Sequence, residues 1–146
     1  METKPTPVKF ALIRILTEQF ATLDENFVDK EEISLGVNIK FGVDVPLRAI
    51  TVFVTIRFEV KSQPFLLLEA GCIFGVSPQS WESFIQPDAK IILIPEGFLT
   101  HLSVITTGTC RGILHSKTEG TAYNRFLLPT INVTELVKGD ISLPLE

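Results

Sequence analysis

The side chains best suited to covalent chemistry are two histidines and a cysteine in the second half of the chain. His101, Cys110 and His115 are spaced nine and five residues apart, and this spacing does not bring all three to one face of a helix. A Cys–His nucleophile pair can therefore form only through the fold, which leaves a small hydrolase as an open alternative. We expect Cys110 and the other cysteine, Cys72, to be reduced and packed as small apolar groups.

Short motifs that mark other chemistries are missing from the sequence. It has no Cys-x-x-Cys or His-x-x-x-His spacing for a metal ion, no Gly-x-Gly-x-x-Gly or Walker loop for nucleotide phosphates, and no Gly-x-Ser-x-Gly for a serine nucleophile. We therefore predict no catalytic residues, no metal site and no cofactor.

Composition narrows the class of protein further. The 146 residues are 45% hydrophobic and only 21% charged, which excludes intrinsic disorder and fits one domain over 1–146. The net charge of −4 argues against a nucleic-acid partner. The start of the chain has no apolar signal region and the longest apolar run is far too short to span a bilayer, so we expect a cytoplasmic protein without membrane insertion.

The first half of the chain is predicted to form four strands, which would position any site. Apolar and polar residues alternate with a period of two over 33–45 and 50–61, and the alternation continues over 65–77. The first strand, over 8–23, alternates less cleanly because Ile13 and Ile15 fall on the face opposite Leu12, which a bulge or a second covered face would explain. These patterns predict a four-stranded antiparallel sheet.

Helices follow the sheet. Phe98, Leu102, Ile105 and Thr109 form one stripe of a long helix that Pro95 opens. The polar stretch 115–125 is typical of an exposed loop, and Asn132 with Glu135 resembles a capping box that opens a short C-terminal helix. We predict an α+β fold with both helices packed on one face of the sheet, and flexible tails over 1–7 and 140–146.

Four local motifs, in this order, are similar to those of the SecB family of protein-export chaperones. They are Arg14-Ile15-Leu16-Thr17, then Leu68-Glu69-Ala70-Gly71-Cys72-Ile73-Phe74, then Leu93-Ile94-Pro95-Glu96, and finally Arg111-Gly112 followed by Leu128-Pro129-Thr130-Ile131-Asn132. The resemblance implies an ATP-independent holdase that binds unfolded or preprotein polypeptides, and a homo-oligomer built as a dimer of dimers, a homotetramer.

The resemblance also implies an apolar groove between the helices and the sheet edge. Its expected lining is Phe27, Val37, Trp81, Phe84, Leu128 and Val133. Trp81 lies in a Pro- and Ser-rich connection, so we expect it to be partly exposed. The family docks the export ATPase SecA through acidic residues, but the corresponding positions here are Gln19, Leu23 and Leu67, so engagement of SecA is doubtful.

A second hypothesis belongs to a different class. The same fold can serve as a dedicated binding module for one specific protein partner, as in a SecB-like chaperone associated with a toxin and its antitoxin. Capture of one stoichiometric partner, instead of a range of unfolded chains, would favour it.

Overall fold

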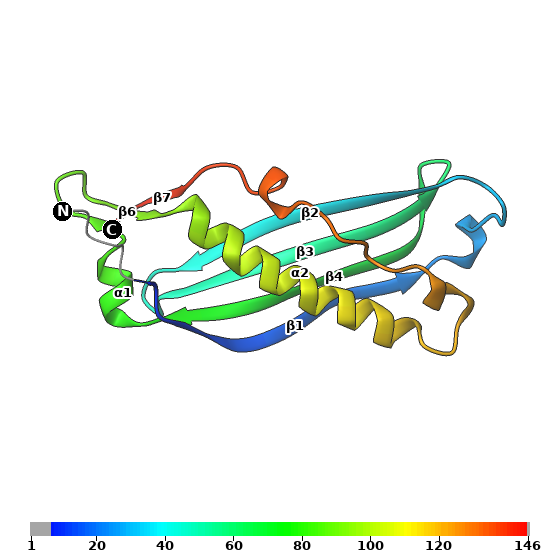
Figure 1. Cartoon of the computed structure of the whole chain (residues 1–146), viewed down its shortest axis with the longest axis horizontal. Helices are drawn as coiled ribbons and strands as arrows, with labels where there is room; N and C mark the ends of the chain where they lie inside the picture. The colour runs from blue at the N-terminus through cyan, green and yellow to red at the C-terminus, as the bar shows by residue number, and fades with distance from the viewer. Residues whose placement is uncertain (1–6, 146) are drawn as a thin grey trace.

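The main sheet contains four antiparallel strands, as the alternation predicts. The computed structural model describes residues 7–145, and its strands are β1 (Phe10–Thr22), β2 (Ile33–Asp44), β3 (Ala49–Val60) and β4 (Gln63–Val76). Their order across the sheet is β1-β4-β3-β2, so β1 and β2 are the two edge strands (Figure 1).

The period of two explains how the sheet buries one face. Every second residue of β3, from Ile50 to Val60, is buried, whereas the residues between them remain partly accessible. The edge strand β1 departs from this rule, because its pairing with β4 shifts between Leu12 and Arg14 and again between Thr17 and Gln19. The first shift leaves Ile13 unpaired and exposed, so of the two explanations for the irregular alternation the structure supports the bulge.

One long helix, α2 (Glu96–Thr118), crosses the sheet and packs against β3 and β4 (Figure 1). This confirms the predicted long helix, but α2 continues through residues 115–118, where the sequence predicts an exposed loop. Leu114 and Thr118 are buried, and the Thr118 hydroxyl donates to the Leu114 carbonyl at 2.9 Å. Packing therefore stabilises the last turn of α2. The sequence prediction missed it because most residues of this stretch are polar.

Gly120, with a φ of +78°, follows the helix, and the rest of the expected loop is also structured. A 3-10 turn, η2 (Ala122–Arg125), buries Tyr123 in the core. A second turn, η3 (Val133–Glu135), stands where the short C-terminal helix is expected, and the Asn132 side chain caps it by accepting from the Thr134 N–H at 3.2 Å.

A small second sheet lies at the end of the molecule where α1 (Pro78–Glu82) caps the main sheet. Its strands are β5 (Ile85–Gln86), β6 (Ile91–Ile94) and β7 (Ile141–Pro144), in that order. The expected C-terminal tail over 140–146 is thus corrected for Ile141–Pro144, whose backbone pairs with β6. The expected tail at 1–6, and residue 146, lie outside the described residues.

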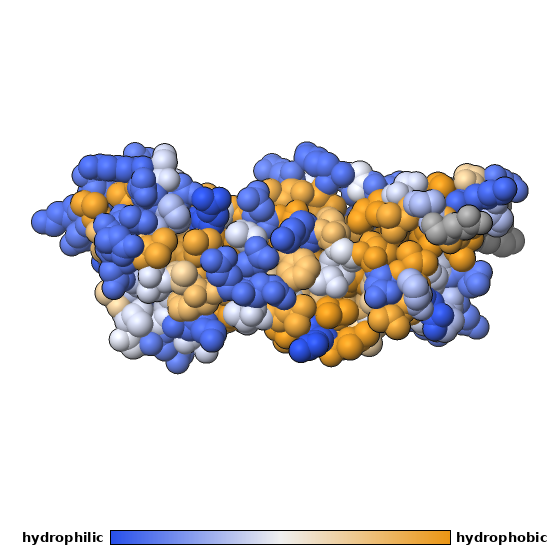
Figure 2. Space-filling view, turned by 180° about the vertical axis from the view of Figure 1, so that it is seen from behind, coloured by the Kyte–Doolittle hydropathy of each residue, from blue (hydrophilic) through white to orange (hydrophobic). Residues whose placement is uncertain are grey.

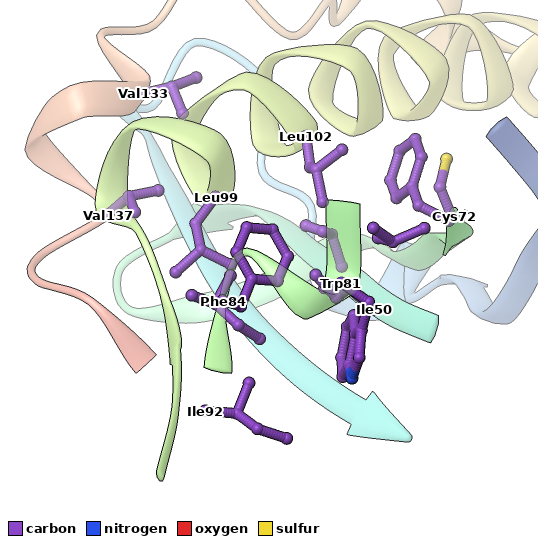
Figure 3. Packing of buried hydrophobic residues seen from close by; sticks show 13 residues of the cluster. Ile50, Cys72, Trp81, Phe84, Ile92, Leu99, Leu102, Val133 and Val137 are labelled. Atoms are coloured by element: carbon purple, nitrogen blue, oxygen red, sulfur yellow. The ribbon is translucent and has the colours of Figure 1, made fainter. Parts of the chain in front are cut away.

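The core consists of two apolar clusters between α2 and the sheet. The first gathers residues from β3, β4, α1, β6 and the N-terminal half of α2, and Figure 3 shows Phe84, Leu99 and Val137 packed within it. The second gathers residues of the other ends of β3 and β4 with Cys110, Leu114 and Tyr123. A further 3-10 turn, η1 (Asp24–Asn26), connects β1 to the loop that contributes Phe27 to this second cluster.

Candidate functional site

The thiol and the two imidazoles lie in different surroundings. Cys110 is fully buried and its Sγ lies 3.6 Å from the Ala70 carbonyl oxygen. The His101 ring packs edge-on against Phe10, with 5.7 Å between ring centroids. His115 Nε2 lies 3.7 Å from a Glu119 carboxylate oxygen at the surface.

Burial also decides the acidity of the Cys110 thiol. Desolvation, with a smaller contribution from the neighbouring Cys72, raises the pKa of Cys110 from 9.0 to about 12. Since the thiolate is the reactive form, a thiol with this pKa is a poor nucleophile at neutral pH. The arrangement does not support the Cys–His hydrolase alternative.

The six residues expected to line an apolar groove fall into two groups. Trp81, Phe84 and Val133 belong to the first core cluster and Leu128 belongs to the second, against which the partly buried Phe27 and Val37 pack. Trp81 is only 5% exposed, which corrects the expectation of partial exposure, because its indole packs against Phe84 at 5.8 Å. Two of the six reach a surface depression: Phe84 lines one beside α1, and Val133 lines one beside α2.

An aromatic network accounts for the burial of Phe27. Its ring lies 4.9 Å from Phe65 and 5.5 Å from Tyr123, centroid to centroid. The Tyr123 hydroxyl donates to Asp24 Oδ1 at 2.6 Å, and burial together with this carboxylate raises the pKa of Tyr123 to about 12. Phe27 is therefore fixed by packing and hydrogen bonding within the chain.

Three exposed apolar side chains lie close together in sequence elsewhere, on the edge strand β1. Leu12, Ile13 and Ile15 are 45%, 63% and 50% exposed. Leu12 and Ile15 pair with the buried Phe74 and Cys72 and so lie on the helix side of the sheet, where their exposure means that α2 does not cover them. We call these three side chains, with the free backbone edge of β1, the β1 edge surface.

Ile13 extends this surface to the opposite face of the sheet. A Cβ added to Gly75 would lie 2.5 Å from Ile13 Cδ1, so the isoleucine side chain rests directly over the glycine. A shallow depression of about 380 Å³ adjoins it and is lined by Phe10, Ala11 and Val76, among others. Apolar groups are therefore accessible on both faces of the same strand.

Polar groups on the outer face are concentrated on the other strands. Glu69 accepts from the Thr55 hydroxyl at 3.1 Å and lies 3.5 Å from Lys40 Nζ. Arg57 and Glu59 lie 3.6 Å apart on the same face. Figure 2 shows this face with apolar patches near its middle and toward the end that carries α1, separated by hydrophilic residues.

The backbone of β1 adds a second kind of contact. The strand pairs only with β4, so along its outer edge the described residues supply no neighbouring strand. Unpaired N–H and C=O groups on an edge strand are a template for a further strand. The two bulges interrupt this template and leave Arg14–Thr17 as a regular segment between them.

The β1 edge surface is the candidate site that the sequence-based list of site residues misses. The signal is the irregular alternation of the first strand, in which Ile13 and Ile15 fall out of phase with Leu12. That irregularity identifies a bulge, but it does not say that the apolar residues on both sides of the bulge stay exposed.

Two searches of the described residues gave negative results. Within residues 7–145, no helix is long and apolar enough to cross a membrane. In the same part of the chain, no group of three or more His, Cys, Asp or Glu side chains is arranged to hold a metal ion.

Among the comparisons with known proteins, only the comparison with solved structures gives a match. No family model matches the chain, and no curated protein matches it. Among solved structures, the chain is similar to a SecB-like chaperone of Mycobacterium tuberculosis, Rv1957, in complex with a ChAD peptide from the Rv1956 HigA1 antitoxin. The two chains are 12% identical, the alignment covers 86% of this chain and 90% of that chain, and the TM-score is 0.42.

Proposed function

We propose that this protein is an ATP-independent holdase that binds non-native polypeptides along the β1 edge surface. The observation that carries the proposal is the exposure of Leu12, Ile13 and Ile15 on an edge strand that pairs on one side only. An extended polypeptide would add to β1 through backbone hydrogen bonds and would bury these side chains.

Both contributions are independent of the bound sequence. Every polypeptide carries the same backbone donors and acceptors, and apolar burial, at about 25 cal/mol per Å², has no directional requirement. Neither contribution needs a nucleotide. Promiscuous binding of unfolded or preprotein chains follows from these two terms.

Aggregation of a chemically denatured model protein, followed by light scattering, tests the proposal. We expect the purified protein to suppress aggregation without nucleotide, and we expect Ile13→Asp and Ile15→Asp to remove most of this effect. Both side chains are at least half exposed, so the substitutions should leave the fold intact.

A matched control is available in Leu127→Asp, which also places a charge at an exposed apolar position, 55% accessible, but outside β1. Suppression by this variant should equal that of the wild type. If the wild type shows no suppression at several-fold molar excess, or if all three variants behave alike, the proposed function is wrong.

The bulges of β1 favour a second candidate, a dedicated module for one protein partner. Because Ile13 and Glu18 are left out of the ladder with β4, a partner strand longer than Arg14–Thr17 would have to match the shape of a bulged edge. Binding assays with several unrelated denatured chains separate the two candidates. Comparable affinities support the holdase, whereas saturable binding of a single partner supports the module.

The proposal includes self-association as a dimer of dimers. The solvent side of α2 supports it, because from Thr100 to Cys110 the helix has no Asp, Glu, Lys or Arg and exposes 53% of Val104. At Gly97, Gly108 and Gly112 an added Cβ would meet nothing within 4 Å, so a second helix has room to approach.

A further inference from the structure

A separate cavity lies between α2 and the chain segment that leads into η3. It has a volume of about 370 Å³, which falls in the range of roughly 300–1,000 Å³ typical of small-molecule sites. Val104, Thr107 and Arg111 form the helix wall, and residues 130–134 form the opposite wall. We call it the Arg111 pocket; it shares no lining residue with the depression on β1.

Arg111 provides the charge in this pocket. Its Nε donates to the Leu128 carbonyl at 2.8 Å and one Nη donates to the Pro129 carbonyl at 3.0 Å. A guanidinium has five N–H donors, so these two bonds fix its position and leave other donors for a ligand. Among residues 7–145, no carboxylate lies within 4.0 Å of Arg111, and none of the lining residues is acidic.

Thr107, in the same wall of the pocket, carries an unsatisfied hydroxyl. It is 3% exposed, and its Oγ1 is the one buried side-chain oxygen or nitrogen without a hydrogen-bond partner in the described part of the chain. The buried hydroxyls of Ser103, Thr106 and Thr118 on the same helix all donate to the carbonyl four residues earlier. Thr107 lines the pocket one helical turn before Arg111 instead.

The remaining walls combine polar and apolar groups. Asn132 Oδ1 accepts from the backbone N–H and the hydroxyl of Thr134, which leaves the amide NH₂ of Asn132 as a further donor. Val104, Ile131 and Val133 supply apolar surface. Donors and one positive charge therefore face a cavity that also has room for an apolar stem.

We propose that the Arg111 pocket binds a carboxylate group carried on a short apolar stem. Arg111 would contribute the charge-assisted hydrogen bond. Thr107 Oγ1, which exposes less than 1 Å², would gain the partner that it lacks when its side chain turns toward the ligand. The carboxylate can belong to a free small acid or to the C-terminus of a polypeptide; the chemistry recognised is the same. This inference does not depend on polypeptide binding at β1, because no residue of the β1 edge surface lines the pocket, and it shares Val104 with the solvent side of α2.

Amide NMR titrations of the full chain test the proposal with isovalerate, its neutral analogue isovaleramide, N-acetylvaline and N-acetylvalinamide. We expect the two carboxylates to shift the resonances of Thr107, Arg111 and residues 130–134 saturably, and the two amides to leave them unchanged. Binding of isovalerate alone identifies a free small acid as the ligand class. Binding of N-acetylvaline as well extends the site to polypeptide C-termini.

Two variants show whether the named residues hold the ligand. Arg111→Gln should raise the dissociation constant for isovalerate about tenfold or more, because it removes the charge-assisted bond. Thr107→Val preserves the shape and removes the unpartnered hydroxyl, so it should fold at least as well as the wild type and bind several-fold more weakly. If Arg111→Gln does not fold, Thr107→Val decides the question.

Arg57→Gln is the matched control, since Arg57 lies on the outer face of the sheet in an ion pair with Glu59. It should bind isovalerate as the wild type does. Equal shifts with carboxylate and amide, or equal affinities for the wild type, Thr107→Val and Arg57→Gln, would overturn the proposal. Loss of aggregation suppression in Ile13→Asp tests the holdase alone and leaves this result unaffected.

Discussion

At the scale of single residues, the buried thiol of Cys110 makes stability depend on pH. In the unfolded chain the thiol ionises near its ordinary pKa of 9.0, whereas in the folded chain burial raises this pKa to about 12. The unfolded state therefore binds fewer protons between these values, and stability falls as pH rises through this window. Below it, the contribution of the thiol is fully present.

Urea unfolding at about pH 8 and about pH 10 measures this effect. We expect the free energy of unfolding of the wild type to fall between these two pH values and that of Cys110→Ala to fall less. At the lower pH the variant should already be less stable than the wild type, because the truncated side chain leaves a cavity. Tyr123→Phe serves as the comparison, since the pKa of Tyr123 is raised from 10.0 to about 12 and its effect belongs at higher pH. Identical slopes for the wild type and Cys110→Ala would contradict the assignment.

Two glycines of β4 give a second prediction at this scale. A Cβ at Gly71 would lie 2.6 Å from the Val52 carbonyl oxygen and 2.8 Å from the Phe53 ring, so the sheet backbone would have to shift. At Gly75 the added Cβ meets only the end of the exposed Ile13 side chain, which can rotate away. We expect Gly71→Ala to cost about 1–3 kcal/mol and Gly75→Ala about 1 kcal/mol or less, as measured by chemical denaturation.

The residue scale also shows where sequence reasoning succeeds. The sequence predicts buried, reduced cysteines, and both thiols are free and buried. It places Trp81 partly in solvent, and this is wrong because α1, which Ser77 caps, turns the indole into the first core cluster. Exposure depends on what packs over a residue, and a local pattern such as a Pro- and Ser-rich connection does not contain that information.

At the scale of elements, packing accounts for the length of α2 better than helix propensity does. The helix contains three glycines and five threonines, which are poor helix formers. It nevertheless continues to Thr118 because residues such as Leu102, Cys110 and Leu114 are buried against β3 and β4. A period of two is easily recognised in the strands, whereas the helix end depends on a surface that is distant in sequence.

A matched pair of truncations tests this account of α2. Leu114→Ala removes a fully buried side chain and should destabilise the fold by about 2–5 kcal/mol. Val104→Ala, at an exposed position of the same helix, should change stability by about 0.5 kcal/mol or less. Similar losses in both variants, measured by thermal and chemical unfolding, would mean that propensity and not burial holds the helix.

The element scale also explains why the candidate site is only partly predictable. The four strands, the bulge near Ile13 and the long helix all follow from periodicity and are confirmed. The second sheet is not predicted, because β5 and β7 are only two and four residues long and have too few residues to show a period. The exposure of β1 is missed because it depends on the path of α2, which leaves the N-terminal part of that strand uncovered (Figure 1).

At the scale of the whole molecule, the proposed self-association would use two surfaces. One is the solvent side of α2 around Val104 and Gly108, within the stretch Thr100–Cys110 that has no Asp, Glu, Lys or Arg, and the other is the β1 edge surface. A closed dimer of dimers contains two kinds of twofold contact. Each of these two surfaces would form one of them. In that arrangement a second copy protects β1, and a non-native polypeptide competes with it for the same edge.

Light scattering coupled to size exclusion tests this arrangement directly. We expect a mass four times the 16.2 kDa of one chain, and we expect Gly108→Glu to halve it by placing a charge between the helices. Gly108→Glu should still suppress aggregation because β1 is unchanged. Ile13→Asp should have half the assembly mass of the wild type and should no longer suppress aggregation. A wild-type mass of 16.2 kDa at every concentration would exclude the assembly. A full tetramer in Ile13→Asp that no longer suppresses aggregation would instead mean that β1 is an open binding edge and that the second contact lies on another surface.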